Sequence, residues 1–218
     1  MGHAEISGDQ LFIYSHIITY GNAADPAVTE NIRDEIETMW NEPTAILQLK
    51  SRALTVVFKI TASLQQGINP VEIYSNTDPR NNYFRIEEFA HGNISFVDGV
   101  GCNTGYFKLE NLYKGSTTAA HEYGHTIGLH HPEDTDLRGK GIPGIMYPRG
   151  TLVDPQYQYN PAGVAGDSTN GGTMHPKYRK VWQSDIALLN LHKLDFDDGK
   201  AIVGEFTSIW HPGHSQVG

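Results

Sequence analysis

Hydrophobic and polar residues along the first half of the chain follow patterns that predict strands and helices in turn. Residues 11–20 and 54–62 are rich in aromatic and β-branched types, which is typical of strands. Between them, Asp25 and Pro26 are a typical helix cap and first helical residue. Apolar residues then recur at helical spacing until Pro43. We therefore expect a strand, a helix and a second strand.

Four shorter apolar runs follow, separated by turns that are rich in Asn, Gly and Asp. We interpret them as short strands at residues 71–74, 83–89, 94–97 and 106–109. The next segment has helical character and runs from Ser116 through the sequence HEYGHTIG to Gly128.

The chain changes in character after this helix. Residues 132–180 contain many prolines and glycines and show no sustained period, which predicts a segment built of loops. A last helix is expected over residues 184–194, with Ser184 as its N-cap. Strands in the first half and separate helices together indicate an α+β fold.

Length and charge limit the classes of protein. The 218 residues are enough for one domain with a core, so we expect a single domain with an upper lobe of about residues 1–130 and a lower lobe of about residues 131–218. The net charge of -9 repels phosphate backbones, so nucleic acid is not an expected partner. No apolar run approaches the ~20 residues of a membrane-spanning helix. A monomer is the favoured oligomeric state.

The cysteine count and the first residues bear on the cellular compartment. Cys102 is the only cysteine, so no intrachain disulfide can form, and we expect it to be a small buried residue. The first residues, MGHAE, lack the apolar core of a signal peptide and look like an extension joined to the domain. A leader or pro-segment can have been removed, so export cannot be read from this chain.

The predicted helix after Ser116 carries residues that can bind a metal. His121 and His125 are four residues apart, so both project from one face of a helix and can share one zinc ion. Glu122 is rotated from them by about a third of a turn. It is therefore close enough to act on a water molecule as a general base without having to bind the metal.

The third ligand of such a site must come from outside the helical face, since a catalytic zinc has three protein ligands and one open position. Gly128 can adopt the left-handed conformation that ends a helix, so that His131 can return to the metal. Gly124 lies in mid-helix between two ligands, and alanine is expected to be accepted there. The spacing HExxHxxGxxH is too specific to be attributed to chance.

This stretch resembles the zinc-binding signature of the metzincin metalloendopeptidases, which also have a methionine-containing turn downstream. The sequence GIMYP at residues 144–148 is similar to that turn and most like its form in the matrixins. The resemblance implies that Met146 forms an apolar floor beneath the three histidines. Pro132 after the third histidine is instead similar to the serralysins, so the chain resembles a divergent metzincin.

The resemblance also implies a fold and an activity. The fold is a zincin-like catalytic domain, with a twisted mixed β-sheet and two helices in an upper lobe and an irregular lower lobe that ends in a helix. The activity is that of a zinc-dependent endopeptidase with one catalytic Zn²⁺, secreted or delivered outside the producing cell. Substrate binding is expected in the segment after the methionine turn, for which the candidates are Tyr147, Tyr157, Tyr159 and His175.

An extended protein or peptide substrate is expected to pair with an edge strand, either residues 83–89 or residues 94–97. Two alternatives stay open: a zinc amidase of narrow specificity or delivered toxin protease, and a catalytically silent binding module. The presence of Glu122 argues against the silent module. Residues 195–199 (DFDDG) are similar in composition to a calcium-binding loop, but they lack the length and the terminal glutamate of an EF-hand. The sequence therefore does not support Ca²⁺ binding there.

Overall fold

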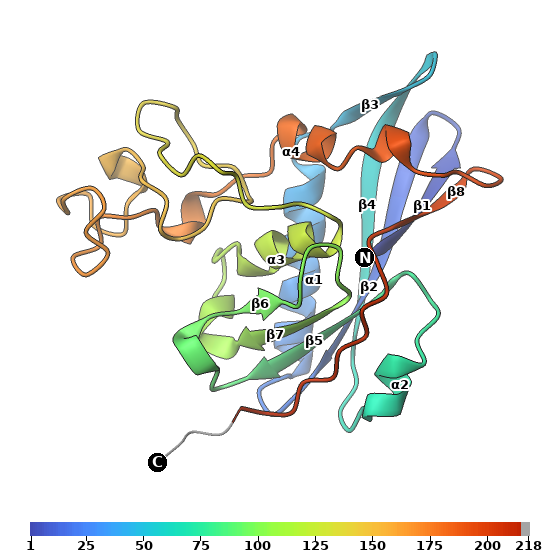
Figure 1. The fold of residues 1–218 in the computed structure, drawn as a ribbon, viewed down its shortest axis with the longest axis horizontal. Coiled ribbons are helices and arrows are strands. Elements are labelled where there is room, and N and C mark those ends of the chain that lie inside the picture. The colour runs from blue at the N-terminus through green and yellow to red at the C-terminus, as the bar shows by residue number, and fades with distance from the viewer. Residues whose placement is uncertain (215–218) are drawn as a thin grey trace.

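The computed structural model describes residues 1–214 and shows an α+β fold around one mixed sheet of eight strands (Figure 1). The main path of the sheet has the order β3-β4-β2-β5-β7-β6, and β1 pairs with β2 and β8. The strands are β1 (Gly2–Ser7), β2 (Gln10–Tyr20), β3 (Ile46–Leu49), β4 (Arg52–Leu64), β5 (Asn81–Glu87), β6 (Phe96–Val97), β7 (Thr104–Lys108) and β8 (Lys200–Val203).

The long strand β2 organises the sheet. Along one edge it pairs with β4 in parallel over most of its length. Along the other edge its first half pairs with β1 antiparallel and its last residues pair with β5 in parallel. Strand β7 extends the parallel part, and the short β6 pairs with β7 antiparallel and ends the sheet.

Within residues 1–214, four α-helices accompany the sheet, of which α1 and α3 pack against each other on one face of it (Figure 1). Trp40 of α1 is buried between Phe58 of β4 and Tyr123 of α3, with ring centroids 5.3 and 5.8 Å away. Its indole N–H also donates to the carbonyl of Ala120 at 3.0 Å. These contacts fix α3 relative to the sheet. The helices are α1 (Pro26–Asn41), α2 (Pro70–Tyr74), α3 (Thr118–Thr126) and α4 (Gln183–Leu188).

The start of α3 is capped by a side chain from α1. Thr117, the N-cap residue, has left-handed backbone angles, and its side chain makes no capping hydrogen bond. Instead the Glu35 carboxylate accepts the backbone N–H groups of Thr117 at 3.2 Å and Ala120 at 3.3 Å. Burial raises the pKa of Glu35, and these N–H groups oppose that rise. Helix α1 therefore determines both the position and the beginning of α3.

The predicted strand–helix–strand unit is present as β2, α1 and β4, and Asp25 caps α1 by accepting from the N–H of Val28 at 2.7 Å. The strand predicted at residues 71–74 is wrong, because this segment belongs to α2. Asn69 and Glu72 form a reciprocal capping box there, with Pro70 at the first helical position. This local capping prevails over the apolar residues that favoured a strand.

The last predicted helix is shorter than expected. It ends at Leu188, and Asn190 follows with a left-handed φ of 52° before a single 3₁₀ turn at residues 191–193. Ser184 is not its cap. The N–H of Trp182 donates to the Asp185 carboxylate at 2.7 Å, so the acidic residue inside the first turn closes the helix start.

The first residues are not an extension beside the domain, because Gly2–Ser7 forms β1 within the sheet. Met1 is fully buried, and its carbonyl accepts hydrogen bonds from Ser15 Oγ at 2.9 Å and Asn82 Nδ2 at 2.8 Å. Residues 197–200 form a tight turn that leads into β8, the other partner of β1. Cys102 is a buried free thiol, as predicted.

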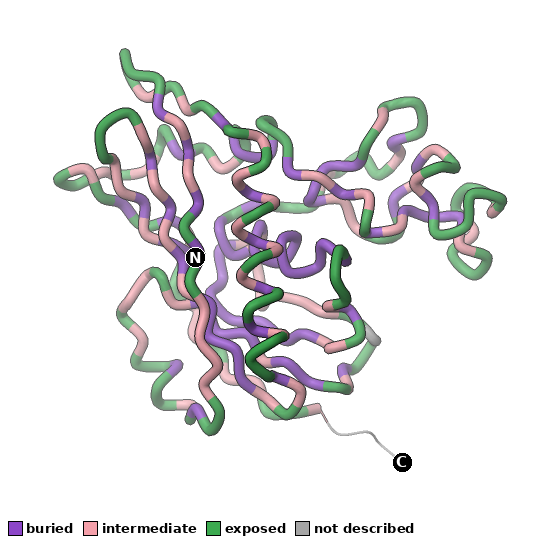
Figure 2. The backbone as a smooth tube through the Cα atoms, turned by 180° about the vertical axis from the view of Figure 1, so that it is seen from behind, coloured by how far each residue is buried: buried purple, intermediate pink, exposed green. Residues whose placement is uncertain are grey.

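Residues 132–180 contain no α-helix and no extended strand, as predicted, and form a group of loops that extends away from the sheet (Figure 1, yellow to orange). They have a small core of their own, made of Leu137, Val153 and Met174. The main core lies between the sheet and helices α1 and α3, where Figure 2 shows the longest buried stretches. Within residues 1–214, no helix is long and apolar enough to cross a membrane.

Candidate metal centre

The end of α3 turns sharply at Gly128. This residue has a φ of 108°, as the sequence predicts, and its N–H donates to the carbonyl of His125 at 3.1 Å. The N–H of Leu129 reaches back to the carbonyl of Gly124 at 3.0 Å. This pair of bonds is a Schellman motif, which requires a left-handed residue at the position of the glycine. The turn sends the chain back over the helix towards His131.

Two of the three histidines are held by backbone carbonyls. His121 Nδ1 lies 2.7 Å from the carbonyl oxygen of Ile145, and His125 Nδ1 lies 2.7 Å from that of Leu129. A carbonyl oxygen can only accept, so each Nδ1 carries the hydrogen. The Nε2 atom of each neutral ring therefore has a free lone pair, which is the tautomer that binds a metal through Nε2.

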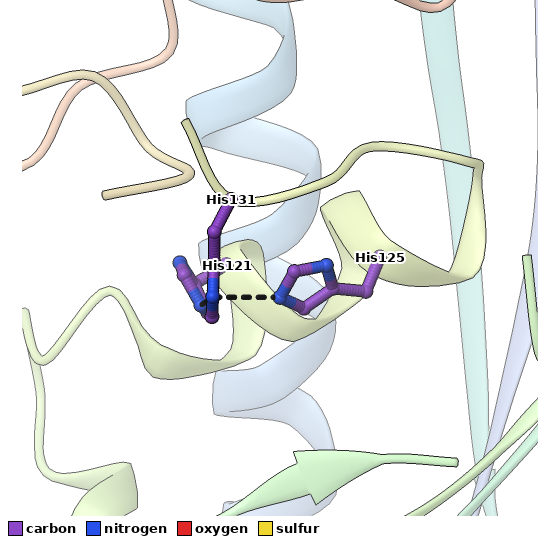
Figure 3. A group of neighbouring side chains, drawn as sticks. All are labelled: His121, His125 and His131. Carbon is purple, nitrogen blue, oxygen red and sulfur yellow. Dashed lines mark hydrogen bonds between the residues drawn. The ribbon is translucent and has the colours of Figure 1, made fainter. Parts of the chain in front are cut away.

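The third imidazole completes a convergent set (Figure 3). His131 Nε2 lies 3.0 Å from Nε2 of His121 and 3.0 Å from Nε2 of His125. His131 has at most one Nε2 hydrogen to donate, so it cannot satisfy both lone pairs at once. One cation bound to all three nitrogens resolves this conflict. Three imidazole nitrogens are a donor set that suits zinc, with room for a fourth ligand from outside.

The histidines are also kept in the form that binds metal. Burial lowers the pKa of His121 well below 6.5 and that of His125 to about 4. The pKa of His131 is lowered as well, by partial burial and by the positive charge of Arg179. All three rings are therefore neutral at neutral pH, and proton competition for the lone pairs is weak.

Met146 packs against the metal-binding helix at Gly124. A Cβ atom at Gly124 would overlap Met146 Sδ, and would lie 3.2 Å from Met146 Cε and 3.1 Å from Trp40 Cζ2. Alanine at Gly124 would therefore require Met146 to shift, a contact that the helix pattern alone could not indicate. The absence of a side chain between His121 and His125 is what lets the buried methionine approach the helix backbone.

Glu122 lies in a cleft with a volume of about 370 Å³, which the three histidines also line. Burial raises the pKa of Glu122 to about 8, and the charge of Arg179 and the Val97 N–H oppose that rise. The other lining residues come from residues 94–97, from Thr118, and from Pro148, Arg149 and Arg179.

Of the two predicted edge strands, the one at residues 94–97 is a strand only at Phe96–Val97 (β6), which lies at the sheet edge, and all four residues line this cleft. Residues 83–89 are not an edge, because β5 pairs with β2 on one side and β7 on the other. The four candidates for substrate binding do not line the cleft. Tyr147 and Tyr157 pack on the small core of the loop segment, and Tyr159 stacks on His175 at 4.4 Å.

The sequence motif did not indicate the two arginines of the cleft. Arg149 and Arg179 lie outside any recognisable spacing pattern, and Arg179 is far from Glu122 in sequence. The only local signal was the position of Arg149 directly after the GIMYP turn.

The α+β fold, the mixed sheet and the convergent histidine triad agree with the metzincin resemblance of the sequence. No protein-family model matches the chain. The chain is 26% identical over 204 residues to Serralysin G of Dickeya chrysanthemi, a match that covers 86% of this chain and 41% of that protein. The resemblance to the metzincins is therefore not confined to the motif. The chain spans about two fifths of the length of this curated relative.

Two solved structures are also similar to this chain. Archaemetzincin from Methanopyrus kandleri has a TM-score of 0.41 and 12% identity, covering 82% of this chain and 95% of that one. Myroilysin has a TM-score of 0.37 and 14% identity, covering 84% of this chain and 94% of that one. Both TM-scores are below 0.5, so neither similarity bears on function.

Proposed function

We propose that the protein is a zinc-dependent endopeptidase whose zinc ligands are His121, His125 and His131. The observation that carries this proposal is the convergence of three Nε2 atoms, two of them deprotonated because a backbone carbonyl holds Nδ1–H. The 26% identity to Serralysin G over most of the chain supports the peptide as substrate class. Action outside the producing cell belongs to the same proposal and rests on the resemblance alone.

Zinc in such a site acts as a Lewis acid, which polarises the scissile carbonyl and makes a water molecule a stronger nucleophile. Glu122 is the general base: its carboxylate takes the proton of the attacking water and later delivers it to the leaving amine. The Glu122 side chain lines the cleft together with the three histidines. A divalent cation nearby favours the ionised carboxylate, so it lowers the pKa of Glu122 from the raised value that burial produces.

Substrate orientation comes from the sheet edge. Strand β6 pairs with β7 on one side only, so its outer edge has backbone groups available for an extended peptide. Residues Ile94 to Val97 form this side of the cleft, directly beside Glu122. Gly128 and Met146 support the site, Gly128 by turning the chain to His131 and Met146 by filling the space behind Gly124.

The test combines metal analysis with cleavage of an unbiased peptide library, read by mass spectrometry with and without a chelator. We expect one zinc per chain and chelator-sensitive cleavage. Glu122→Gln should keep the zinc and lower turnover by roughly 10²–10⁴, the usual contribution of a general base. Glu133→Gln, an exposed acid two residues after His131, is the matched control and should cleave normally.

Three results would contradict the proposal. Protein that takes up no zinc would remove the metal site. Near-normal turnover in zinc-loaded Glu122→Gln would remove the general base. Zinc-loaded protein that cleaves no library peptide would favour the zinc amidase of narrow specificity or the silent binding module instead.

A further inference from the structure

Arg179 is a buried cation whose guanidinium forms no ion pair or hydrogen bond in the described part of the chain, although the charge of Glu122 attracts it. Only 5% of its surface is exposed, yet it lines the cleft beside Glu122 and the three histidines. Its Nε is buried and has no hydrogen-bond partner, and no ion pair or side-chain hydrogen bond involves its guanidinium within residues 1–214. Buried charges are normally paired, because an unpaired one loses its hydration without compensation.

The backbone around Arg179 is held firmly in place. The carbonyl of Pro176 accepts a hydrogen bond from Thr117 Oγ1 at 2.8 Å, which anchors this segment to the start of α3. On the other side, the N–H of Lys180 donates to the carbonyl of Pro143 at 2.9 Å, just before the turn that contains Met146. These bonds hold the backbone, and burial restricts the Arg179 side chain, so a ligand meets a guanidinium with little freedom left to lose.

Arg149 adds a second positive charge to the cleft lining. Its Nη2 donates to Asn111 Oδ1 at 2.9 Å. Glu122 is the only acidic side chain among the lining residues of the described chain. The net charge of the whole protein is -9, so this cleft is a local cationic region on an acidic molecule. Such a cleft attracts an anionic group rather than a basic one.

We propose that Arg179 is a specificity-determining residue that binds a carboxylate of the substrate next to the scissile bond. A guanidinium matches a carboxylate through two parallel N–H···O bonds, and within residues 1–214 no acceptor is hydrogen-bonded to the donors of Arg179. The carboxylate can belong to an acidic side chain or to the C-terminus of a short peptide. This inference rests on the proposed function, since it assumes that a peptide occupies the cleft.

The test measures peptide binding rather than cleavage, with zinc-loaded Glu122→Gln protein, in which cleavage is expected to be roughly 10²–10⁴-fold slower. Three fluorescent hexapeptides of one sequence serve as probes: one with a central Asp and an amidated C-terminus, one with Asn in place of Asp, and the Asn peptide with a free C-terminal carboxylate. We expect one carboxylate-bearing peptide to bind roughly 10- to 100-fold more tightly than the amidated Asn peptide, as charge-assisted hydrogen bonds allow. The peptide that binds more tightly identifies the source of the carboxylate.

Variants assign that preference to Arg179. Arg179→Met keeps the side-chain volume and should bind all three peptides with similar Kd. Arg179→Lys keeps the positive charge but lacks the two parallel N–H donors of a guanidinium, so it should retain only part of the preference. Arg80→Gln removes the same charge from a distant exposed ion pair with Asp78 and should leave the preference intact. Equal loss in Arg80→Gln, or full preference in Arg179→Met, would overturn the assignment.

The parent preference is informative even if Arg179→Met does not fold. Equal binding of the three peptides to the protein that carries Arg179 overturns the inference without any variant. Failure of this inference can be distinguished from failure of the proposed function. Zinc content and library cleavage test whether the protein is a zinc endopeptidase, while the ratios of peptide Kd values test the role of Arg179.

Discussion

Substitution of Gly124 by alanine has two opposing effects on the free energy of unfolding, and they are of similar size. In an isolated helix the change would gain about 1 kcal/mol, because glycine is a poor helix former. In this protein the new methyl group would overlap Met146 Sδ and approach Trp40 Cζ2 to 3.1 Å. Both neighbours are buried in the core, so neither can move into solvent. Overpacking of this kind costs about 1–3 kcal/mol.

We therefore expect Gly124→Ala to lower the free energy of unfolding by about 1–2 kcal/mol, despite the better helix propensity. A change of that size lowers the Tm by about 2–4 °C per kcal/mol in a chain of this length. Thermal and urea unfolding of the zinc-free protein isolates the packing effect. Chelator competition on the same proteins after zinc loading shows whether displacement of Met146 also weakens zinc binding.

A double-mutant cycle identifies the cause. Met146→Ala removes both methionine atoms that meet the new Cβ, so Gly124→Ala in that background should be neutral or slightly stabilising. Gly150→Ala is the matched control, because its Cβ would meet nothing within 4 Å. If Gly124→Ala stabilised the parent, or cost the same with and without Met146, then the methionine contact would not be the reason for glycine at this position.

Three further predictions concern the supports of the site. Gly128→Val should reduce zinc affinity in chelator competition more than it reduces the free energy of unfolding. A side chain at a φ of 108° costs about 1–2 kcal/mol, and here the strain falls on the turn that leads to His131. Unchanged zinc affinity would show that this turn does not position His131. Glu35→Ala should lower the free energy of unfolding in urea by about 1–2 kcal/mol, since it leaves the N–H groups of Thr117 and Ala120 at the start of α3 without their acceptor; no loss would show that the cap is dispensable. Burial raises the pKa of Asp185 from 3.8 to about 6, so its folded state favours the protonated form, and the associated stability is present below about pH 4 and lost as the pH rises through 6. Relative to the parent, Asp185→Asn should therefore gain about 2–3 kcal/mol of stability between pH 4 and pH 7 in urea unfolding, and a pH-independent difference would refute this.

Local patterns in the sequence predicted the parts of the fold that depend on local interactions. The cap of α1 at Asp25, the strand β2 and the positive φ of Gly128 all follow from short-range preferences. The missed strands β1, β3 and β8 depend on partners elsewhere in the chain, and β1 pairs with β8 from the opposite end of the sequence. No periodicity within four to six residues can reveal such a pairing.

The candidate site divides in the same way. The spacing of His121, His125 and His131 is a property of one helix and one turn, so the motif places them together. The acceptors for their Nδ1 atoms and the arginine of the cleft come from segments without a pattern. Total charge was also a poor guide to the cleft, since the acidic chain has a lining with two arginines and one glutamate.

Both hydrogen bonds that orient His121 and His125 end on main-chain oxygens, at Ile145 and Leu129. Every amino acid supplies a backbone carbonyl, so no point mutation can delete either acceptor; only a change in the path of the chain can. In evolutionary terms, these two positions are free to drift among apolar residues without altering the imidazole tautomers. Mutations that disturb the orientation of the two imidazoles should therefore be insertions, deletions and glycine replacements near the two turns. A deep mutational scan would detect them there.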